Sequence, residues 1–294
     1  MTVYTLLASP AGSAAPSSQG NSDTGQEHQH LLWRVTSQQG STAYVLGSMH
    51  MGTKDLSLDN CVRRIFQESK VLVTEVDMDK LLNPLTALSM LGRMMLPEGK
   101  TLDQVISPVT YAELTRYAQG LGLSMENLRK MKPWAVCTTL GTTKLKQSGF
   151  SEKDGIDYQV LLAAKEMQKT HKGLEAINDQ IDILDRMSPA EQEKMLQEGL
   201  KELDSGVVQM AAMVQAWKSG DVSVFEKKAL PSLQKNPETY RRLIVERNQN
   251  WVRPVEECLQ KNEDCFIVVG ATHLVGADGL PELLRKKGYT VERQ

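Results

Sequence analysis

The chain lacks several features that would indicate a function at once. None of its apolar runs reaches the roughly 18 residues expected of a transmembrane helix. Its 34 basic and 36 acidic residues leave a formal net charge of −2, so no basic excess favours nucleic-acid binding. It has no His-Glu-x-x-His motif, and its four cysteines form no Cys-x-x-Cys pair. We therefore expect no transmembrane segment, no nucleic-acid partner and no zinc-finger framework.

The composition indicates a globular protein with an atypical N-terminal stretch. A chain of 294 residues, 40% hydrophobic and 24% charged, can bury the core of one large α/β domain or two small ones. Residues 9–29 are rich in Ser, Gly, Ala, Pro and Gln, a composition that buries little surface. We predict that residues 1–30 are a disordered leader or linker and that residues 31–294 form a single α/β domain.

What the chain does contain is two Gly-x-x-His elements, Gly47 to His50 and Gly270 to His273. Each follows a short apolar run that reads as a buried strand ending in a glycine turn. Ligands of parallel sheets bind at the carboxyl ends of the strands, so both imidazoles can share one site if their strands are neighbours. One such element alone is typical of a turn glycine and a capping histidine, but two matching contexts favour a shared site.

A carboxylate follows a third strand-like run. Residues 71–77 are apolar and β-prone, and they include Glu75. Two histidines and one glutamate are a common ligand set for a catalytic zinc with an open position for water, and the set also suits other divalent metals. In the alternative interpretation Glu75 pairs with an arginine or caps the following helix, and spacing alone does not decide between the two.

A fourth element, residues 246–251, lies late in a helical segment that starts near Pro237. Arg247 offers a planar fork of donors for a carboxylate or a developing oxyanion, and Asn248 could bind substrate or orient a ligand. Taken alone, however, the pattern favours a solvated helix face with Trp251 as its apolar anchor.

The order of the apolar runs predicts the fold class. Strands are expected at 42–46, 71–75, 266–269 and 289–292, with helices at 58–69 and 279–287 and mostly helices over 80–252, apart from a short strand near 170–177 that carries Glu175. The prediction is an α/β fold whose central, largely parallel or mixed sheet is built from N- and C-terminal β-α-β segments. A large helical insertion, about residues 80–252, separates these segments.

Two further features have open interpretations. Cys258 and Cys265 bracket a polar turn, where they could form a disulfide, which would suit an oxidising compartment, or remain thiols. The methionine-rich residues 85–96 favour a helix that packs the insertion onto the sheet; the alternative is an adaptable wall of a peptide-binding cleft.

Taken in order, these residues resemble the TraB/GumN family, which is related to the Tiki proteins. The likeness runs from residue 32 to 293 and includes the two Gly-x-x-His elements and the segments 75–77, 155–157, 173–175 with Gln180, and 247–251. The resemblance implies an α/β fold in which both Gly-x-x-His loops face one cleft. It also implies a site made of His50, Glu75, Arg247, Asn248 and His273, with Glu175 and Gln180 in a second motif.

Tiki proteins are divalent-metal-dependent proteases, and erythromycin esterases are distant relatives, so the resemblance implies a hydrolase. The main hypothesis is a metal-dependent hydrolase acting on a peptide or protein substrate. His50, His273 and Glu75 would hold Mn, Co or Zn, Glu75 or Glu175 would take a proton from water, and Arg247 would stabilise the oxyanion.

Two alternatives remain open. The first is a metal-free, esterase-like hydrolase with His50 or His273 as general base. The second is a non-catalytic peptide-binding or regulatory protein of the cell envelope. Exported relatives favour a periplasmic or secreted location, with a cytoplasmic one as the alternative. The sequence predicts no particular oligomeric state.

Overall fold

The computed structural model describes residues 29–77 and 83–294. All but the last two residues of the predicted leader, 1–30, lie outside the described residues. In the part that the structure describes, no helix is both long and apolar enough to cross a membrane.

A six-stranded mixed sheet forms the centre of the molecule. Its strands are β1 (Leu32–Thr36), β2 (Thr42–Ser48), β3 (Val71–Val76), β4 (Thr170–Glu175), β5 (Cys265–Gly270) and β6 (Thr290–Arg293). Their order across the sheet is β4-β3-β5-β2-β1-β6. The strands β4, β3, β5 and β2 run parallel, whereas β1 is antiparallel to both β2 and β6.

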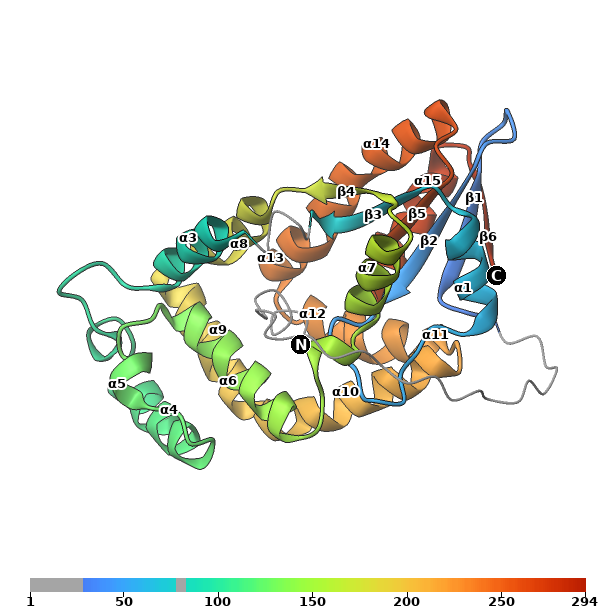
Figure 1. Ribbon diagram of the computed structural model, residues 1–294. Coiled ribbons are helices and arrows are strands. Elements are labelled where there is room, and N and C mark those ends of the chain that lie inside the picture. The colour runs from blue at the N-terminus through green and yellow to red at the C-terminus, as the bar shows by residue number, and fades with distance from the viewer. Residues whose placement is uncertain (1–28, 78–82) are drawn as a thin grey trace.

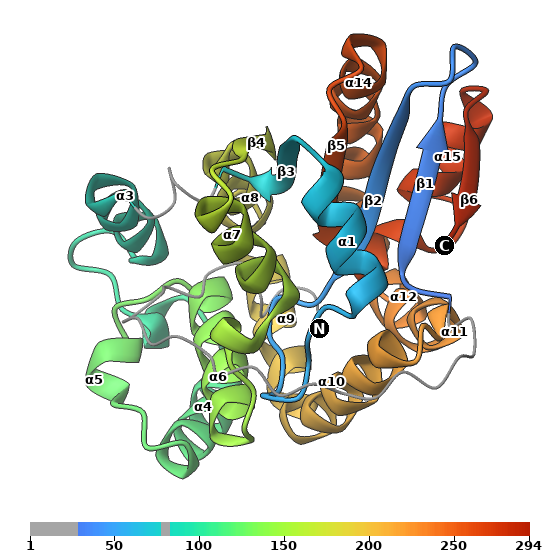
Figure 2. The ribbon, with the colours of Figure 1, turned by 45° about the vertical axis from the view of Figure 1, so that its right-hand side comes forward.

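The central strands are buried on both faces, which explains their composition. Every residue of β3 is buried, as is all of β5 except its last residue. Such strands read as continuous apolar runs because helices cover both sides of a parallel sheet. Figures 1 and 2 show α1 and α7 over one face of the sheet and α14 and α15 over the other.

The helices that cover the sheet come from both halves of the chain. They are α1 (Asn60–Glu68), α7 (Ile156–Glu166), α14 (Glu246–Lys261) and α15 (Leu280–Lys286). Asp59 begins α1 by accepting a hydrogen bond from the amide of Val62. Gly288 follows the end of α15 with φ of +91°, a left-handed conformation that glycine adopts without strain.

Many of the remaining helices form an arm that projects away from the sheet (Figure 1). The arm consists of α3 (Pro84–Met94), η2 (Leu102–Gln104), α4 (Pro108–Gly120), α5 (Met125–Leu128), α6 (Pro133–Gln147), α8 (Ile177–Asp185) and α9 (Pro189–Lys201). The rest are η3 (Glu152–Asp154), α10 (Leu203–Lys218), α11 (Val222–Val224), η4 (Phe225–Ala229), α12 (Leu230–Gln234), α13 (Pro237–Tyr240), η5 (Arg241–Val245) and η6 (Ala271–Leu274). The α9 helix starts at a capping box in which Ser188 and Glu191 bond each other's backbone amides.

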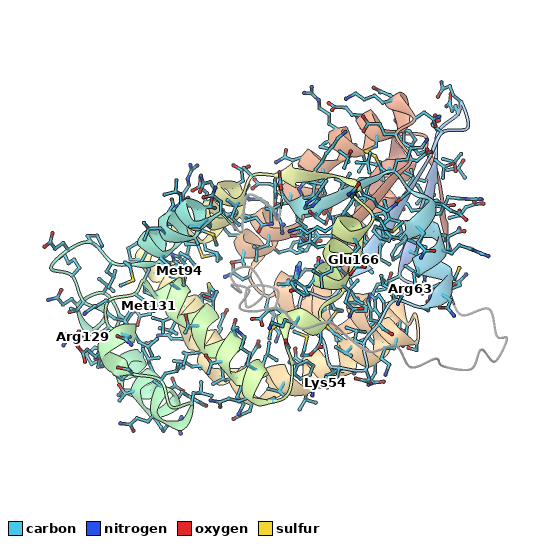
Figure 3. All side chains as sticks on the ribbon, in the orientation of Figure 1. Lys54, Arg63, Met94, Arg129, Met131 and Glu166 are labelled. Atoms are coloured by element: carbon cyan, nitrogen blue, oxygen red, sulfur yellow. A yellow bond between two sulfur atoms is a disulfide. The ribbon has the colours of Figure 1, made fainter. Side chains whose placement is uncertain are left out.

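The methionine-rich helix α3 does not pack onto the sheet, so that part of the sequence prediction is wrong. Arg93 instead ties α3 to α8 through Asp182 and through Asp185, whose Oδ2 lies 3.0 Å from Nη2 of Arg93. Met94 and Met131 (Figure 3) both pack against a separate hydrophobic cluster that joins the arm to α12 and η5. The α3 helix has no buried residue because its packing partners cover only one side of it.

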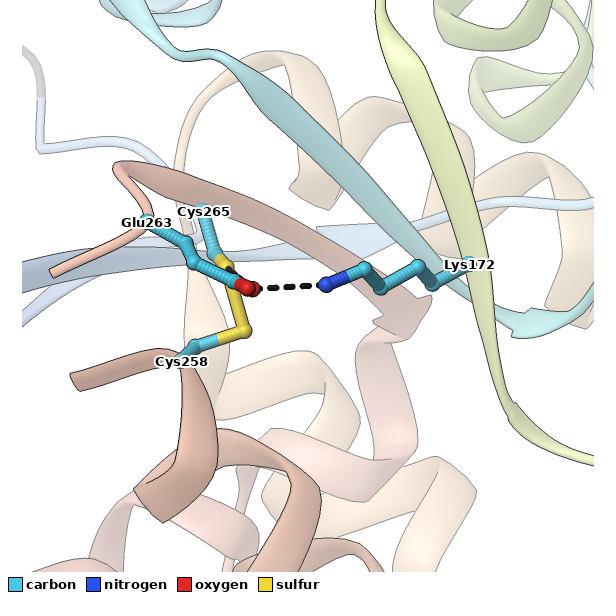
Figure 4. Close-up of a disulfide and its surroundings, with 4 residues drawn as sticks. All are labelled: Lys172, Cys258, Glu263 and Cys265. Atoms are coloured by element: carbon cyan, nitrogen blue, oxygen red, sulfur yellow. Dashed lines mark hydrogen bonds and ion pairs between the residues drawn. A yellow bond between two sulfur atoms is a disulfide. The ribbon is translucent and has the colours of Figure 1, made fainter. Parts of the chain in front are cut away.

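Cys258 and Cys265 form a disulfide that joins the end of α14 to the start of β5. Glu263, in the turn between the two cysteines, accepts a 2.7 Å hydrogen bond from Lys172 of β4 (Figure 4). The disulfide and the ion pair therefore tie α14 and β4 to the start of β5. Of the two cysteines outside this bond, Cys61 is exposed and Cys137 is buried.

The predicted fold class is confirmed, with two differences in detail. The opening residues 32–36 form an additional antiparallel strand, β1, which pairs with β2. The strands β2 and β3 flank one helix in sequence but are not neighbours, because β5 from the C-terminal segment lies between them. The N- and C-terminal segments are therefore interleaved in one sheet, as β3-β5-β2.

Replacing Cys258 with serine should lower the stability of the protein by about 2 kcal/mol, because the disulfide restricts the unfolded chain over a short loop. Thermal unfolding of the Cys258→Ser and Cys61→Ser variants measures the difference. Cys61 is exposed, so its substitution should change the melting temperature little. Equal melting temperatures for the two variants would contradict the assignment.

Candidate active site

The sheet topology brings together three side chains that are far apart in the sequence, at the carboxyl ends of the parallel strands. The strands β3, β5 and β2 are parallel neighbours, so their carboxyl ends lie side by side. Glu75 lies at the end of β3, His273 lies in the turn η6 after β5, and His50 follows β2. The carboxyl ends of the strands are where ligands of parallel sheets bind.

Arg247 of α14 holds two buried carboxylates together. Its Nη2 donates to Oε2 of Glu75 at 2.5 Å and to Oε1 of Glu175 at 2.7 Å, and its Nε also donates to Glu175. Nη1 donates to the carbonyl of Leu243 and to Nε2 of His273, 3.0 Å away. All five N–H groups of the guanidinium therefore have acceptors. In this arrangement Arg247 is a clamp on carboxylates and has no N–H left for an oxyanion.

The tautomer of His273 follows from its two neighbours. Nε2 faces an arginine, which can only donate, so Nε2 is an acceptor and the ring proton is on Nδ1. Nδ1 then donates to Oδ1 of Asn248 at 2.7 Å. The Asn248 amide is itself oriented, because its nitrogen donates to the carbonyls of His273 and Asp278. Burial and the charge of Arg247 lower the pKa of His273 to about 3, so the ring is neutral at pH 7.

His50 is oriented in a parallel manner by Asp157 of α7. Nδ1 of His50 lies 3.0 Å from Oδ2 of Asp157, whose other oxygen accepts from the hydroxyl of Ser48. Nε2 of His50 points toward Glu75 and lies 3.9 Å from Oε1, a gap wide enough for a third atom. Burial disfavours the imidazolium, but the charge and hydrogen bond of Asp157 and the charge of Glu75 outweigh it and raise the pKa of His50 to about 9.

A glycine permits this contact between α7 and the His50 loop. A Cβ on Gly155 would lie 2.3 Å from the carbonyl oxygen of His50, a clash with backbone. The next residue, Ile156, donates its amide to the carbonyl of Met49 at 2.8 Å. The Gly155–Asp157 segment therefore positions both the loop and the imidazole of His50.

The three side chains converge beside Gly270. A Cβ placed on Gly270 would lie 3.4 Å from Oε1 of Glu75, 3.5 Å from Nε2 of His50 and 3.6 Å from Cδ2 of His273. The cavity there measures about 50 Å³, room for about three water molecules. Its other walls are largely apolar and come from α10 and η4.

The comparison with known families is decisive at this point. The model of the TraB/PrgY/gumN family matches residues 31–293, nearly the whole chain. The chain belongs to the TraB/PrgY/gumN family. The predicted resemblance is thus confirmed over the range that the sequence indicated.

The relatives of this family member differ in how much is known of them. The chain is 25% identical to the uncharacterised YbaP protein of Escherichia coli K12 over 82% of the chain and 87% of that protein. It is 23% identical to the metalloprotease TIKI1 of Homo sapiens and to the metalloprotease TIKI2 of Xenopus tropicalis. Each of these matches covers 89% of the chain but only 61% and 59% of the relative, respectively. No solved structure matches the chain.

The two carboxylates bonded to Arg247 differ in environment. Burial raises the pKa of Glu75, but the positive charges of Arg247 and His50 and the amide of Gly270 together hold it far below its usual range. Burial raises the pKa of Glu175 in spite of Arg247. The oxygens of Glu175 accept hydrogen bonds from Arg247, Gln180 and the indole of Trp251. This carboxylate does not line the cavity. Only Glu75 presents an oxygen, Oε1, to the cavity.

The residues fit a divalent metal in donor type and in the orientation of both imidazoles. Each histidine has its Nδ1 held by an oxygen, that of Asp157 or Asn248, which leaves Nε2 as the ligand atom, as in many metal sites. Glu75 is ionised and supplies an oxygen. The atoms are not gathered as tightly as in a preformed site, since Nε2 of His273 accepts from Arg247. Over residues 29–77 and 83–294 the one compact group of potential ligands is Cys258, Glu263 and Cys265, and its two sulfurs are bonded to each other.

The structure brings together the residues that the sequence analysis singled out. His50, Glu75, Glu175, Arg247, Asn248 and His273 all belong to one network. The solvated-face interpretation of residues 246–251 is wrong, because Arg247, Asn248 and Trp251 are buried. The alternative interpretation of Glu75 as the partner of an arginine describes a contact that does exist.

Asp157 gained no role from sequence reasoning, and Gly270 was interpreted only as the glycine of a turn that ends a strand. Gly155-Ile156-Asp157 belongs to the resemblance, and an aspartate in the first turn of a helix commonly serves the helix dipole. The signal that could have revealed its role is the glycine before it, which marks a close backbone approach. The closeness of His50 depends on tertiary packing that no local pattern encodes.

Replacing Arg247 with methionine should destabilise the protein by about 3–5 kcal/mol, because it leaves two buried carboxylates without their partner. Chemical unfolding measures this loss. The Arg241→Met variant is the control, because Arg241 is exposed and its ion pairs contribute little. Adding Glu75→Gln and Glu175→Gln to Arg247→Met should recover part of the loss. A loss no larger than that of the control would contradict the clamp.

The metal-free protein should lose stability as the pH rises from about 6.5 to about 9, because His50 binds a proton more tightly in the folded state than in the unfolded state. Its contribution is complete below the unfolded pKa of 6.5 and disappears as pH passes the folded value. Melting temperatures measured in chelator across this range check the slope. The Asp157→Asn variant should flatten it, and an unchanged slope would refute the pairing.

Proposed function

We propose that this protein is a metal-dependent hydrolase that cleaves peptide bonds at the site formed by His50, Glu75 and His273. The main support is the convergence of two oriented imidazoles and one ionised carboxylate beside Gly270. Family membership and distant relatives that are named metalloproteases point the same way.

Nε2 of His50, Nε2 of His273 and Oε1 of Glu75 would hold a divalent ion such as Mn, Co or Zn. When bound, such an ion acidifies a water molecule and polarises a carbonyl oxygen. Asp157 and Asn248 orient the two rings through their Nδ1 atoms, and His50 would give up its Nε2 proton when it holds the ion. An ion held by Nε2 of His273 would take the lone pair to which Nη1 of Arg247 now donates, so one N–H of Arg247 would need another acceptor.

The chain's own groups would assist hydrolysis in three ways. Glu75 keeps its charge at neutral pH, so its negative charge can orient and polarise a water molecule in the gap beside His50. The N–H of Arg247 that would need another acceptor can donate to the oxyanion that forms at the attacked carbonyl. Met210, Met213 and Phe225 line the small cavity and exclude bulk water, which strengthens these charge interactions.

A second candidate is a hydrolase without a metal, in which Glu75 orients the water molecule. The contact between Arg247 and Nε2 of His273 favours it, because this nitrogen is occupied in the arrangement described. For either candidate we propose a periplasmic or secreted location, because the disulfide suits an oxidising compartment. Non-catalytic peptide binding is the outcome that remains if neither form turns over a peptide.

Gly270→Ala tests the function without removing any catalytic side chain. The added Cβ makes ordinary van der Waals contacts and Gly270 has a negative φ, so the variant should fold. The methyl group occupies the space shared by His50, Glu75 and His273. We expect metal content by mass spectrometry to fall by about tenfold or more, and peptide cleavage with it. The matched control is Gly92→Ala, where the added Cβ meets nothing.

The outcomes separate the candidates. Near-stoichiometric metal in the wild type and Gly92→Ala, lost in Gly270→Ala together with cleavage of unfolded peptides, supports the proposal. Cleavage that persists in chelator but is lost in Glu75→Gln supports the metal-free hydrolase instead. A wild type that binds no metal and cleaves no peptide after reloading with Mn, Co or Zn would contradict both the metal-dependent and the metal-free hydrolase.

A further inference from the structure

The strand β4 has one free edge in the structure. Within residues 29–77 and 83–294 it pairs with β3 alone, at one end of the sheet. Its residues are exposed or half-buried along the whole length, in contrast to the fully buried β3. A strand at such a position directs half of its backbone N–H and C=O groups away from the sheet, where another extended chain can pair with them.

This edge leads to the candidate active site. The last residue of β4 is Glu175, which Arg247 joins to Glu75. A chain paired along β4 would therefore have one end at the buried carboxylates. The opposite edge strand, β6, offers no such connection, because it lies beyond β1 and none of its residues is bonded to Arg247.

A groove continues from the end of β4. It has a volume of about 710 Å³ and runs from Gly173, Leu174 and Glu175 to the side of α3. Leu85 lies on the α3 wall of this groove. Figures 1 and 2 both show α8 between β4 and α3, consistent with a groove whose lining includes the first residues of α8.

Thr86 and Ser89 complete the α3 side of the groove, and an apolar stripe starts at Leu85 and continues along α3 beyond the groove lining. Leu85, Leu88 and Leu91 follow at intervals of three residues and are 76%, 66% and 57% exposed. Residues three apart lie on one face of a helix. Three exposed leucines on one face form an unusual apolar surface, which marks an interaction site. Their side chains could accept apolar side chains of a bound segment but provide no hydrogen bonds.

We propose that the β4 edge and the leucine stripe of α3 together bind the peptide substrate as an added, extended strand with apolar side chains. The β4 backbone supplies main-chain hydrogen bonds and the stripe receives alternate side chains. This inference rests on the proposed peptide hydrolase, since Glu175 links the groove to the site. The segment favoured is an extended stretch of about five or more residues, which is the usual length of a strand.

The test uses the wild-type chain and a fluorescein-labelled pool of peptides of about ten residues with apolar residues at every second position. Fluorescence anisotropy reports binding without requiring cleavage. The Leu85→Glu/Leu88→Glu double variant should weaken binding by about tenfold or more. Val109→Glu is the matched control, because Val109 is 77% exposed on the distant helix α4. All three substituted side chains are exposed, so the variants should stay folded.

Backbone pairing has a signature of its own. N-methylation of every second peptide residue should abolish binding in one register and leave it nearly intact in the other, because only alternate N–H groups face β4. Three results would each contradict the proposed peptide binding: no binding by the wild type, equal weakening in Val109→Glu, or equal tolerance of both methylation registers.

Cleavage of the same pool separates the groove from the hydrolase. Binding that depends on the two leucines and on the methylation register, but occurs without cleavage, supports peptide binding at β4 and contradicts the proposed hydrolase. Cleavage whose KM is unchanged in the Leu85→Glu/Leu88→Glu variant keeps the hydrolase and overturns the groove.

Discussion

The site depends on one buried guanidinium. Arg247 joins Glu75 at the end of β3 to Glu175 at the end of β4 and donates to His273 after β5. Burying three charges is costly unless each is paired and hydrogen-bonded, and here every N–H of the arginine has an acceptor. The clamp fixes the tautomer of His273, lowers the pKa of Glu75 and holds α14 against the strand ends. Catalytic chemistry at His50 and Glu75 would rely on this arrangement without direct participation of Glu175.

The fold supports the clamp through long-range connections. The insertion of β5 between β2 and β3 places His273 between His50 and Glu75. The disulfide of Cys258 and Cys265 connects α14, which carries Arg247, to β5, which leads to His273. The two elements that must stay in register are thus linked covalently at one end and by hydrogen bonds at the other. The proposed peptide groove starts where this network reaches the free edge of the sheet.

Much of the fold and of the site could be predicted from the sequence. The apolar runs of β2, β3 and β5 end at glycines or carboxylates, and the position of such residues at strand ends follows from local patterns. The neighbours of β3 could not be predicted in this way, because strand order depends on packing between distant segments. The burial of Arg247 was missed since a charged helix segment normally faces solvent. The role of Asp157 requires a contact 107 positions away from His50.

The most direct test of the account is a crystal structure grown with Mn²⁺, with anomalous scattering measured at the manganese edge. The account predicts one strong peak beside Gly270, between Nε2 of His50, Nε2 of His273 and Oε1 of Glu75, with Nη1 of Arg247 displaced from the histidine. A fully occupied peak elsewhere, or clear density for Arg247 on Nε2 of His273 with no metal beside Gly270, would contradict it.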